Sequence, residues 1–219
     1  MKSVHHLKDL GFIPYKARRN NSVLNDEDYM ILDKYRFRGL DTIDFKKFKK
    51  IDLEIGFGSG EFMLSRAKAN PEYLYIGCEV YKPGVKRAAR WAFSQGLANI
   101  LIYVGDCREF LSVLSNFTFH DIFILFPDPW PKTRHHKRRL INHDFLRILS
   151  YFFKNKLHFA TDFLDYARFF QSQISFCKEI KLHSFITRRE PFFNTKFENK
   201  SLSRGGKVFH YICNNALSH

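Results

Sequence analysis

The chain has 219 residues, which is the length of one domain or of one domain with an extension. Lysine and arginine outnumber aspartate and glutamate by 36 to 22, and the formal net charge is +14. This excess favours polyanionic partners, with nucleic acid ahead of an anionic membrane surface. No uncharged apolar run is long enough to span a membrane, and the N-terminus lacks the apolar core of a signal peptide. We therefore expect a soluble, cytoplasmic protein with no membrane partner.

Cysteine and histidine spacing argues against disulfides and metal sites. The four cysteines are Cys78, Cys107, Cys177 and Cys213. They are far apart and form no C-x-x-C motif, so we expect reduced thiols rather than a disulfide framework or a zinc ribbon. His135 and His136 have no cysteine or acid pair at a ligand spacing, so we expect no metal. The sequence does not decide between a monomer and a homodimer.

Residues 1–50 are charged and irregular, and we interpret them as a basic N-terminal arm. Basic clusters lie at residues 16–19, 34–38 and 46–50, and a short helix is predicted near residues 26–34. From residue 51 onward, short apolar runs alternate with longer amphipathic segments, which is typical of a parallel sheet covered by helices. Residues 51–219 are therefore predicted to form the second, enzymatic domain.

The predicted elements of this domain follow one another as repeated strand–helix units. Strands are predicted at residues 51–55, 73–79, 100–104, 121–126, 157–161, 180–186 and 207–213, and helices at residues 61–69, 83–95, 108–114, 139–153 and 165–176. The first five strands are almost continuously hydrophobic, which suits strands buried on both faces. The order predicts an α/β protein with a Rossmann-like class I methyltransferase fold, in which a mostly parallel seven-stranded sheet carries helices on both faces.

A glycine-rich turn joins the first predicted strand to the first predicted helix of this domain. It contains Gly56, Gly58 and Gly60, and Glu54 lies just before it. Glycines suit a tight turn that a ligand must approach closely. The turn alone is compatible with a dinucleotide, with S-adenosylmethionine or with no ligand at all.

Three acids narrow this choice. Glu79 ends the second strand, 19 residues after Gly60, where a carboxylate can accept hydrogen bonds from both ribose hydroxyls. Asp106 follows the third strand and is placed for the exocyclic amine of an adenine. Glu54 would repel a pyrophosphate but attract the ammonium and sulfonium groups of S-adenosylmethionine. Glu54 could instead be a helix-capping or ion-paired acid, and Glu79 and Asp106 could be ordinary strand-end acids, but the combination favours S-adenosylmethionine over NAD.

A proline-rich segment follows the fourth strand and leads into a basic run. Because ligands bind at the carboxyl ends of strands in open α/β sheets, we expect Asp128 and Trp130 to lie in the site. Prolines on either side would hold Asp128 rigidly, and Trp130 could form an aromatic wall for a base. Residues 132–139 contain five cations and two histidines, a composition that suits binding of phosphates.

Together these blocks resemble the bacterial single-subunit tRNA (guanine-N7)-methyltransferases. The resemblance covers about residues 51–211 and rests most on the proline–tryptophan block with the basic run. The supporting blocks are residues 53–60, residues 75–80, Gly105-Asp106, Thr161-Asp162 and Thr195-Lys196-Phe197-Glu198. The family implies transfer of a methyl group from S-adenosylmethionine to N7 of a guanine in tRNA, in the variable loop.

The resemblance also implies roles for individual residues. Expected cofactor contacts are Glu54, Gly56, Gly58, Gly60, Glu79, Asp106 and Asp128, of which Asp128 is also catalytic. Expected substrate contacts are Lys132, Asp162, Thr195, Lys196, Phe197 and Glu198. Expected RNA contacts are Arg134, His135, His136, Lys137, Arg138 and Arg139. Residues 199–204 differ from the arginine-rich version of the family, so no contacts are implied beyond Glu198.

The chemistry of guanine N7 sets what the protein must supply. N7 carries an in-plane lone pair and no proton, so it needs alignment rather than a general base. Asp128 would stabilise the positive charge that develops on the purine and could accept hydrogen bonds from N1 and N2. Two alternatives stay open. One is a methyltransferase for an exocyclic amine of another RNA, and the other is a non-catalytic RNA-binding module.

Overall fold

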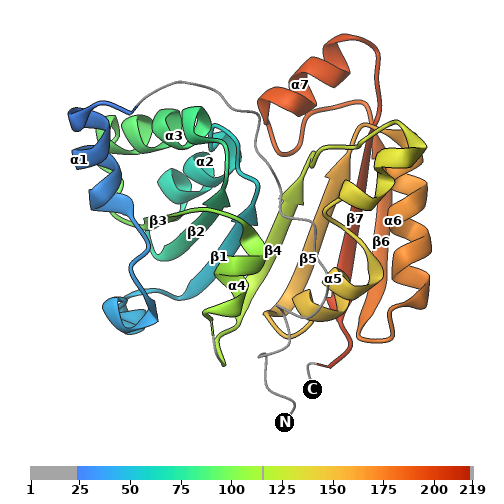
Figure 1. Cartoon of the computed structure of the whole chain (residues 1–219), viewed down its shortest axis with the longest axis horizontal. Coiled ribbons are helices and arrows are strands. Elements are labelled where there is room, and N and C mark those ends of the chain that lie inside the picture. The colour runs from blue at the N-terminus through green and yellow to red at the C-terminus, as the bar shows by residue number, and fades with distance from the viewer. Residues whose placement is uncertain (1–23, 115, 218–219) are drawn as a thin grey trace. The chain divides into compact units, whose positions relative to one another are not determined.

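The computed structural model describes residues 24–114 and 116–217, and its contacts divide the chain into two compact units, residues 1–117 and 118–219. The first unit holds strands in the order β3-β2-β1 and the second holds strands in the order β4-β5-β7-β6 (Figure 1). This division differs from the predicted one at residue 50. The predicted basic cluster at residues 16–19 lies outside the described residues.

The first unit alternates parallel strands with helices, as predicted. Its elements are α1 (Asp26–Tyr35), the 3₁₀ turns η2 (Leu40–Thr42) and η3 (Phe45–Lys47), β1 (Lys50–Ile55), α2 (Glu61–Ala69), β2 (Tyr73–Glu79), α3 (Lys82–Ser94), β3 (Ile100–Val104) and α4 (Cys107–Ser112). In the parallel registers Leu53 pairs with Ile76, and Ile76 pairs with Leu101. The carboxyl ends of β1 and β2 therefore lie side by side, where the predicted cofactor acids follow.

Helix α1 belongs to the core of this unit rather than to a separate arm. Asn25 and Asp28 form a capping box, which explains why the helix begins at Asp26. Leu32 and Tyr35 pack in the same apolar cluster as residues of α3 and β3. The buried Asp28 carboxylate also forms ion pairs with Lys86 (2.6 Å) on α3. Figure 1 shows α1, α2 and α3 side by side, in agreement with these contacts.

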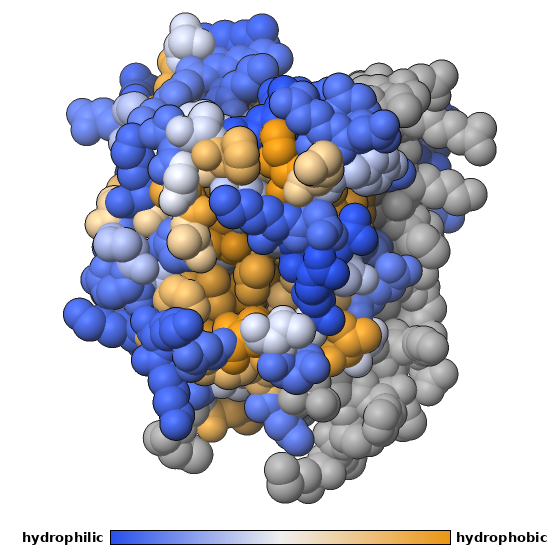
Figure 2. Space-filling model, turned by 90° about the vertical axis from the view of Figure 1, so that its left-hand side faces the viewer, coloured by the Kyte–Doolittle hydropathy of each residue, from blue (hydrophilic) through white to orange (hydrophobic). Residues whose placement is uncertain are grey.

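One face of the first unit exposes apolar side chains. Figure 2 looks at the side on which α1 and α3 lie in Figure 1, and it shows apolar residues grouped among hydrophilic ones. The large exposed apolar side chains of this unit are Tyr29, Met30, Trp91, Phe93 and Val113. No helix in the described part of the chain is long and apolar enough to cross a bilayer.

The second unit carries the antiparallel end of the sheet. Its elements are β4 (Phe119–Leu125), the 3₁₀ segment η4 (Thr133–Arg138), α5 (His143–Leu149), β5 (Phe153–Thr161), α6 (Leu164–Phe176), β6 (Ile180–Arg188), α7 (Lys196–Ser203) and β7 (Val208–Asn215). β4 and β5 are parallel, whereas β7 is antiparallel to β5 and to β6. Phe159 stacks on Phe170 of α6 at 4.1 Å between ring centroids, so α6 covers β5.

Two predictions of secondary structure in this unit are wrong. The helix expected at residues 139–153 covers only His143–Leu149, because Asn142 caps it and Phe153 already starts β5. Helix α7 was not predicted at all. The one buried residue of α7 is Glu198, which is charged. The helix therefore has no apolar face whose spacing in the sequence would have indicated a helix. Figure 1 shows α7 beyond the ends of the strands of this unit.

Candidate active site

The glycine turn has the backbone that its composition predicts. Gly56, Gly58 and Gly60 have φ angles of 76°, 59° and 82°, in the left-handed region that strains other residues. A Cβ atom added at Gly56 or Gly58 would meet nothing within 4 Å, so open space lies in front of these two residues. A Cβ at Gly60 would lie 2.9 Å from Leu64 Cδ1. Gly60 is therefore needed for packing, whereas Gly56 and Gly58 leave room for a ligand.

Glu79 connects the end of β2 to this turn. Its Oε2 accepts a hydrogen bond from the Gly58 N–H (2.7 Å), and its Oε1 accepts from the N–H groups of Val80 (2.7 Å) and Tyr81 (2.8 Å). A carboxylate offers about four lone-pair positions, so few remain for a further donor. A ribose diol would have to share or displace one of these backbone donors.

Glu54 is the buried acid beneath the turn. The backbone N–H of Met63 in the first turn of α2 bonds to its carboxylate, and Oε2 has no partner among the described residues. Burial raises the pKa of Glu54 to about 8. A buried oxygen without a donor is costly, and a cationic ligand would relieve that cost. Glu54 and the open glycines thus fit the ammonium end and the close approach of S-adenosylmethionine.

Asp106 has a structural role that the sequence analysis did not foresee. It caps α4 by accepting from the Arg108 N–H (2.9 Å), and its Oδ1 also accepts from Arg108 Nε (2.7 Å). The guanidinium and the carboxylate form an ion pair as well. An adenine amine would therefore compete with Arg108 for Asp106.

Two further residues support the turn and were missed. A Cβ at Gly84 would lie 2.2 Å from the Gly58 carbonyl oxygen, so glycine is what allows α3 to pack against the turn. Arg87 Nε donates to Ser59 Oγ at 2.9 Å. A glycine in the first turn of the helix that follows a strand-end acid is the sequence signal that could have identified Gly84.

In the second unit, the proline-rich loop is strained where it carries the predicted site residues. Phe126 and Trp130 have φ angles of 52° and 44°, which are uncommon for residues with a Cβ. Asp128 is exposed between them. The Arg138 guanidinium lies over the Trp130 ring at 5.0 Å, and His135 meets that ring edge-on at 5.8 Å. The indole is thus held by the basic run that follows it.

Arg139 corrects one of the expected RNA contacts. Its side chain is 1% exposed, its Nε donates to the Pro129 carbonyl oxygen (2.9 Å), and its guanidinium forms an ion pair with Asp165 of α6. The guanidinium also lies over the Tyr166 ring at 4.9 Å. A group buried in this way cannot reach a phosphate, so Arg139 fastens the proline-rich loop to α6. Lys132, Arg134, Lys137 and Arg138 are exposed, whereas His135 and His136 are half-buried.

The structure also corrects the expectation that Thr195 and Glu198 contact the substrate. Glu198 is fully buried, and its carboxylate accepts hydrogen bonds from the N–H groups of Phe192 (3.0 Å), Phe193 (2.8 Å) and Asn194 (2.7 Å). Thr195 Oγ1 caps α7 by accepting from the Glu198 N–H (3.1 Å). Both residues are therefore parts of the scaffold. The T-x-x-E spacing is a helix-capping signal that was available in the sequence.

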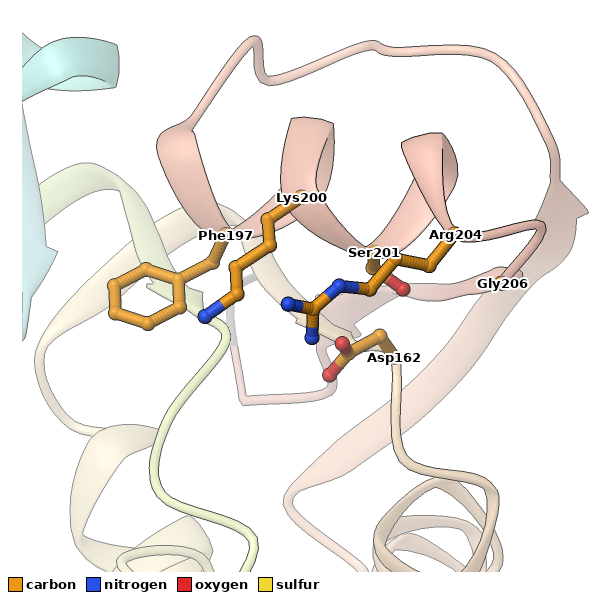
Figure 3. Close-up of a pocket in the computed structure, with 6 residues that line it drawn as sticks. All are labelled: Asp162, Phe197, Lys200, Ser201, Arg204 and Gly206. Carbon is orange, nitrogen blue, oxygen red and sulfur yellow. The ribbon is translucent and has the colours of Figure 1, made fainter.

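Two of the remaining expected substrate residues, Asp162 and Phe197, line a cavity of about 310 Å³, whereas Lys132 and Lys196 do not. Its lining residues are Asp162, Phe197, Lys200, Ser201, Arg204 and Gly206 (Figure 3). Asp162 follows β5, and the other residues come from α7 and the turn after it. Figure 3 shows the Arg204 guanidinium just above the Asp162 carboxylate, whereas the Lys200 side chain extends toward the side on which Phe197 lies. The structure thus brings Asp162 and Phe197 together, as the resemblance implies, and adds Lys200, Ser201 and Arg204, which it did not imply.

Comparison with known proteins identifies the family. A family model described as "Putative methyltransferase" matches residues 49–211. A tRNA (guanine-N(7)-)-methyltransferase of Wolbachia pipientis wMel is 40% identical over 165 residues, which cover 73% of this chain and 72% of that protein. One from Caulobacter vibrioides (strain NA1000 / CB15N) is 38% identical over 167 residues, 74% of each chain. The chain belongs to the tRNA (guanine-N7)-methyltransferase family.

Solved structures agree with this membership at the level of the fold. The crystal structure of TrmN from Thermus thermophilus has a TM-score of 0.58 at 15% identity over 86% of this chain and 48% of that chain. A coclaurine N-methyltransferase bound to N-methylheliamine and SAH has a TM-score of 0.53 at 13% identity over 94% of this chain and 75% of that chain. The predicted Rossmann-like class I fold is confirmed, and S-adenosylmethionine is the methyl donor of this methyltransferase family.

Proposed function

We propose that this methyltransferase modifies N7 of a guanine in the variable loop of tRNA, in the cytoplasm. The observation that carries the proposal is the proline-rich loop, in which an exposed Asp128 is followed at once by the exposed cations Lys132, Arg134, Lys137 and Arg138. The relatives that share this family are named for the same reaction on tRNA. A carboxylate for the reacting base and cations for the phosphates are the two groups that such a reaction requires.

The first unit would hold the methyl donor. Glu54 would bind the ammonium group, Glu79 the ribose and Asp106 the adenine amine, with the last two sharing their carboxylates with the backbone and with Arg108. Bound S-adenosylmethionine supplies an electrophilic methyl group on a sulfonium. The buried and unpartnered oxygen of Glu54 is the strongest support for this assignment.

Asp128 would act on the base. The N7 lone pair of guanine takes up the methyl group directly, so no protein group has to remove a proton. Positive charge then develops on the purine, and the Asp128 carboxylate would stabilise it while accepting hydrogen bonds from N1 and N2. The strained backbone at Trp130 and the buried Arg139 would keep the loop in one conformation, so that little reorganisation is needed during the reaction.

The test is single-turnover methyl transfer to tRNA, followed by mass spectrometry of the nucleosides. We expect 7-methylguanosine from the wild type and a rate that changes little from about pH 6 to about pH 9 at saturating cofactor. Asp128→Asn keeps the shape of the side chain and should lower the rate by on the order of a hundredfold. Asp144→Asn, at another exposed acid in the second unit, serves as the control and should leave the rate unchanged.

Two results would contradict the proposal. A rate that climbs with pH, together with a methylated exocyclic amine, would indicate the alternative reaction. Binding of tRNA without any methylated product would indicate an RNA-binding module. Full activity of Asp128→Asn would remove Asp128 from the mechanism but leave the assignment of the reaction intact.

A further inference from the structure

The cavity under α7 carries charged groups that do not neutralise one another. Asp162, Lys200 and Arg204 all line it (Figure 3), yet among the described residues none of these three side chains has an ion-pair or hydrogen-bond partner. Lys200 lies on α7 and Arg204 is the C-cap residue that follows this helix, and both side chains line the cavity. Two cationic side chains and one carboxylate therefore line the same cavity and are available to bind a ligand.

The chemistry of the lining fits one nucleotide. Lys200 and Arg204 suit a phosphate, and the Asp162 carboxylate suits the N1 and N2 donors of a second guanine, other than the one assigned to Asp128. Phe197 is 60% exposed and offers a ring on which a base can stack. A volume of about 310 Å³ is at the lower end for small-ligand pockets, which agrees with a single nucleotide rather than a longer segment.

The helix that presents these groups is fixed from its other side. Glu198 holds the turn at residues 192–194 through three backbone hydrogen bonds. The Arg188 guanidinium lies over the Phe192 ring at 4.2 Å, and its Nη2 lies 3.2 Å from His210 Nδ1. Because these contacts do not use the residues that line the cavity, the position of α7 does not depend on a ligand.

We propose that Lys200 and Arg204 bind the phosphate of one tRNA nucleotide whose base meets Asp162 and Phe197. This rests on the proposed function, because it assigns the cavity to the RNA substrate.

The test compares Lys200→Gln/Arg204→Gln with a control that loses the same charge, Lys178→Gln/Lys181→Gln, at the opposite end of β6. The salt slope of tRNA affinity should fall by about 0.7 for the first variant and stay unchanged for the control, since one lost phosphate contact with a single strand contributes about 0.7. The KM for tRNA should rise on the order of tenfold with kcat little changed, as expected for a contact made equally before and during reaction.

Guanosine 5′-monophosphate, guanosine and inorganic phosphate separate the possible sources of the phosphate. In NMR titrations of the wild type we expect guanosine monophosphate to shift resonances of α7 more strongly than either of the others. The charge-preserving Lys200→Arg/Arg204→Lys variant should restore the wild-type salt slope. Equal binding of inorganic phosphate alone would overturn the nucleotide assignment.

The outcomes for the cavity and for the reaction are independent. If the wild type forms 7-methylguanosine in tRNA while the double variant keeps the wild-type salt slope and KM, the proposal for the cavity is wrong and the reaction stands. If guanosine monophosphate binds at α7 but no tRNA is methylated, the cavity stands and the reaction does not.

Discussion

At the scale of single residues, Glu54 links the charge state of the protein to its ligand. Its pKa in the folded chain is about 8, because burial disfavours the carboxylate, whereas the ordinary value is 4.5. The unfolded chain therefore loses this proton at lower pH than the folded chain does. The contribution of Glu54 to the free energy of unfolding is therefore fully present below pH 4.5 and decreases as the pH rises. The decrease is complete once Glu54 also ionises in the folded state, near pH 8.

We expect Glu54→Gln to remove this decline in the protein without cofactor. Chemical unfolding of the wild type should show a free energy that falls by a few kcal/mol between about pH 5 and about pH 8, whereas the variant, which cannot ionise there, should lack that component. A parallel decline in both proteins would show that Glu54 is not the group responsible.

The same residue predicts how binding of the cofactor depends on pH. An ammonium beside Glu54 favours the carboxylate, so wild-type affinity for S-adenosylmethionine should rise with pH up to about 8 and then level off. In Glu54→Gln the affinity should be lower and should lack this rise. Calorimetric titration at several pH values measures both effects.

The roles of single side chains were predictable where they depend on position and unpredictable where they depend on burial. Glu54 and Glu79 could be placed beside the glycine turn because each lies at the carboxyl end of a strand. Arg139 and Glu198 could not, because a charge in a sequence looks the same whether it is exposed or buried. The partner of Arg139, Asp165, is 26 residues away along the chain.

At the scale of elements, the close packing of α3 against the glycine turn leads to a specific prediction for Gly84. Gly84→Ala would place a methyl group against the Gly58 carbonyl, a backbone atom that can move only with the turn. We expect the affinity for S-adenosylmethionine to fall by on the order of tenfold, although alanine favours the helix itself. Calorimetry measures the affinity, and circular dichroism checks the helix content.

Ser94→Ala, at the last residue of α3, is the matched control. It adds helix propensity without approaching the turn and should bind the cofactor as the wild type does. Unchanged affinity in Gly84→Ala would mean that the turn shifts freely and that its conformation is not set by α3.

Helices and strands were predicted most accurately where the apolar pattern of the sequence is strongest. The predicted strands at residues 73–79 and 100–104 and the helix at residues 61–69 have the observed bounds, because continuous or periodic burial defines them. Helix α7 is defined by its caps and by Glu198, which a search for apolar periodicity does not detect. The helix predicted at residues 139–153 was too long at both ends. Apolar residues continue on either side of α5, but those before it belong to the segment that follows η4, and those after it lead into β5.

At the scale of the whole molecule, the net charge of +14 is divided between cations that can meet RNA and cations that hold the fold. Arg134, Lys137 and Arg138 are exposed, whereas Arg139 is buried. We expect Arg134→Gln/Lys137→Gln/Arg138→Gln to lower the salt slope of tRNA binding by about 2 for single-stranded contacts, with unchanged thermal stability.

Arg139→Gln should behave in the opposite way. It leaves the exposed charge in place but removes the ion pair with Asp165 and the bond to the Pro129 carbonyl, so the free energy of unfolding should fall by about 1–3 kcal/mol. Anisotropy titrations over a range of salt, with thermal unfolding of each variant, measure the two effects. A large loss of salt slope in Arg139→Gln without loss of stability would contradict the assignment of this residue to the scaffold.

The charge and the motifs were enough to predict the class of partner, the family and the fold of the chain. They were not enough to say which cations remain available, since that depends on contacts between α6, α7 and the loops that precede them.

The separation of buried and exposed residues in and around α7 also has a consequence for engineering of this enzyme. Thr195 and Glu198 fasten the helix through buried hydrogen bonds, while the exposed side chains of Lys196, Phe197, Lys200 and Arg204 form no hydrogen bond or ion pair with the described residues. Substitutions of these exposed residues cost little stability. The RNA specificity of this helix can therefore be redesigned by substitution of its exposed residues, because its attachment to the fold is carried by a separate set of side chains.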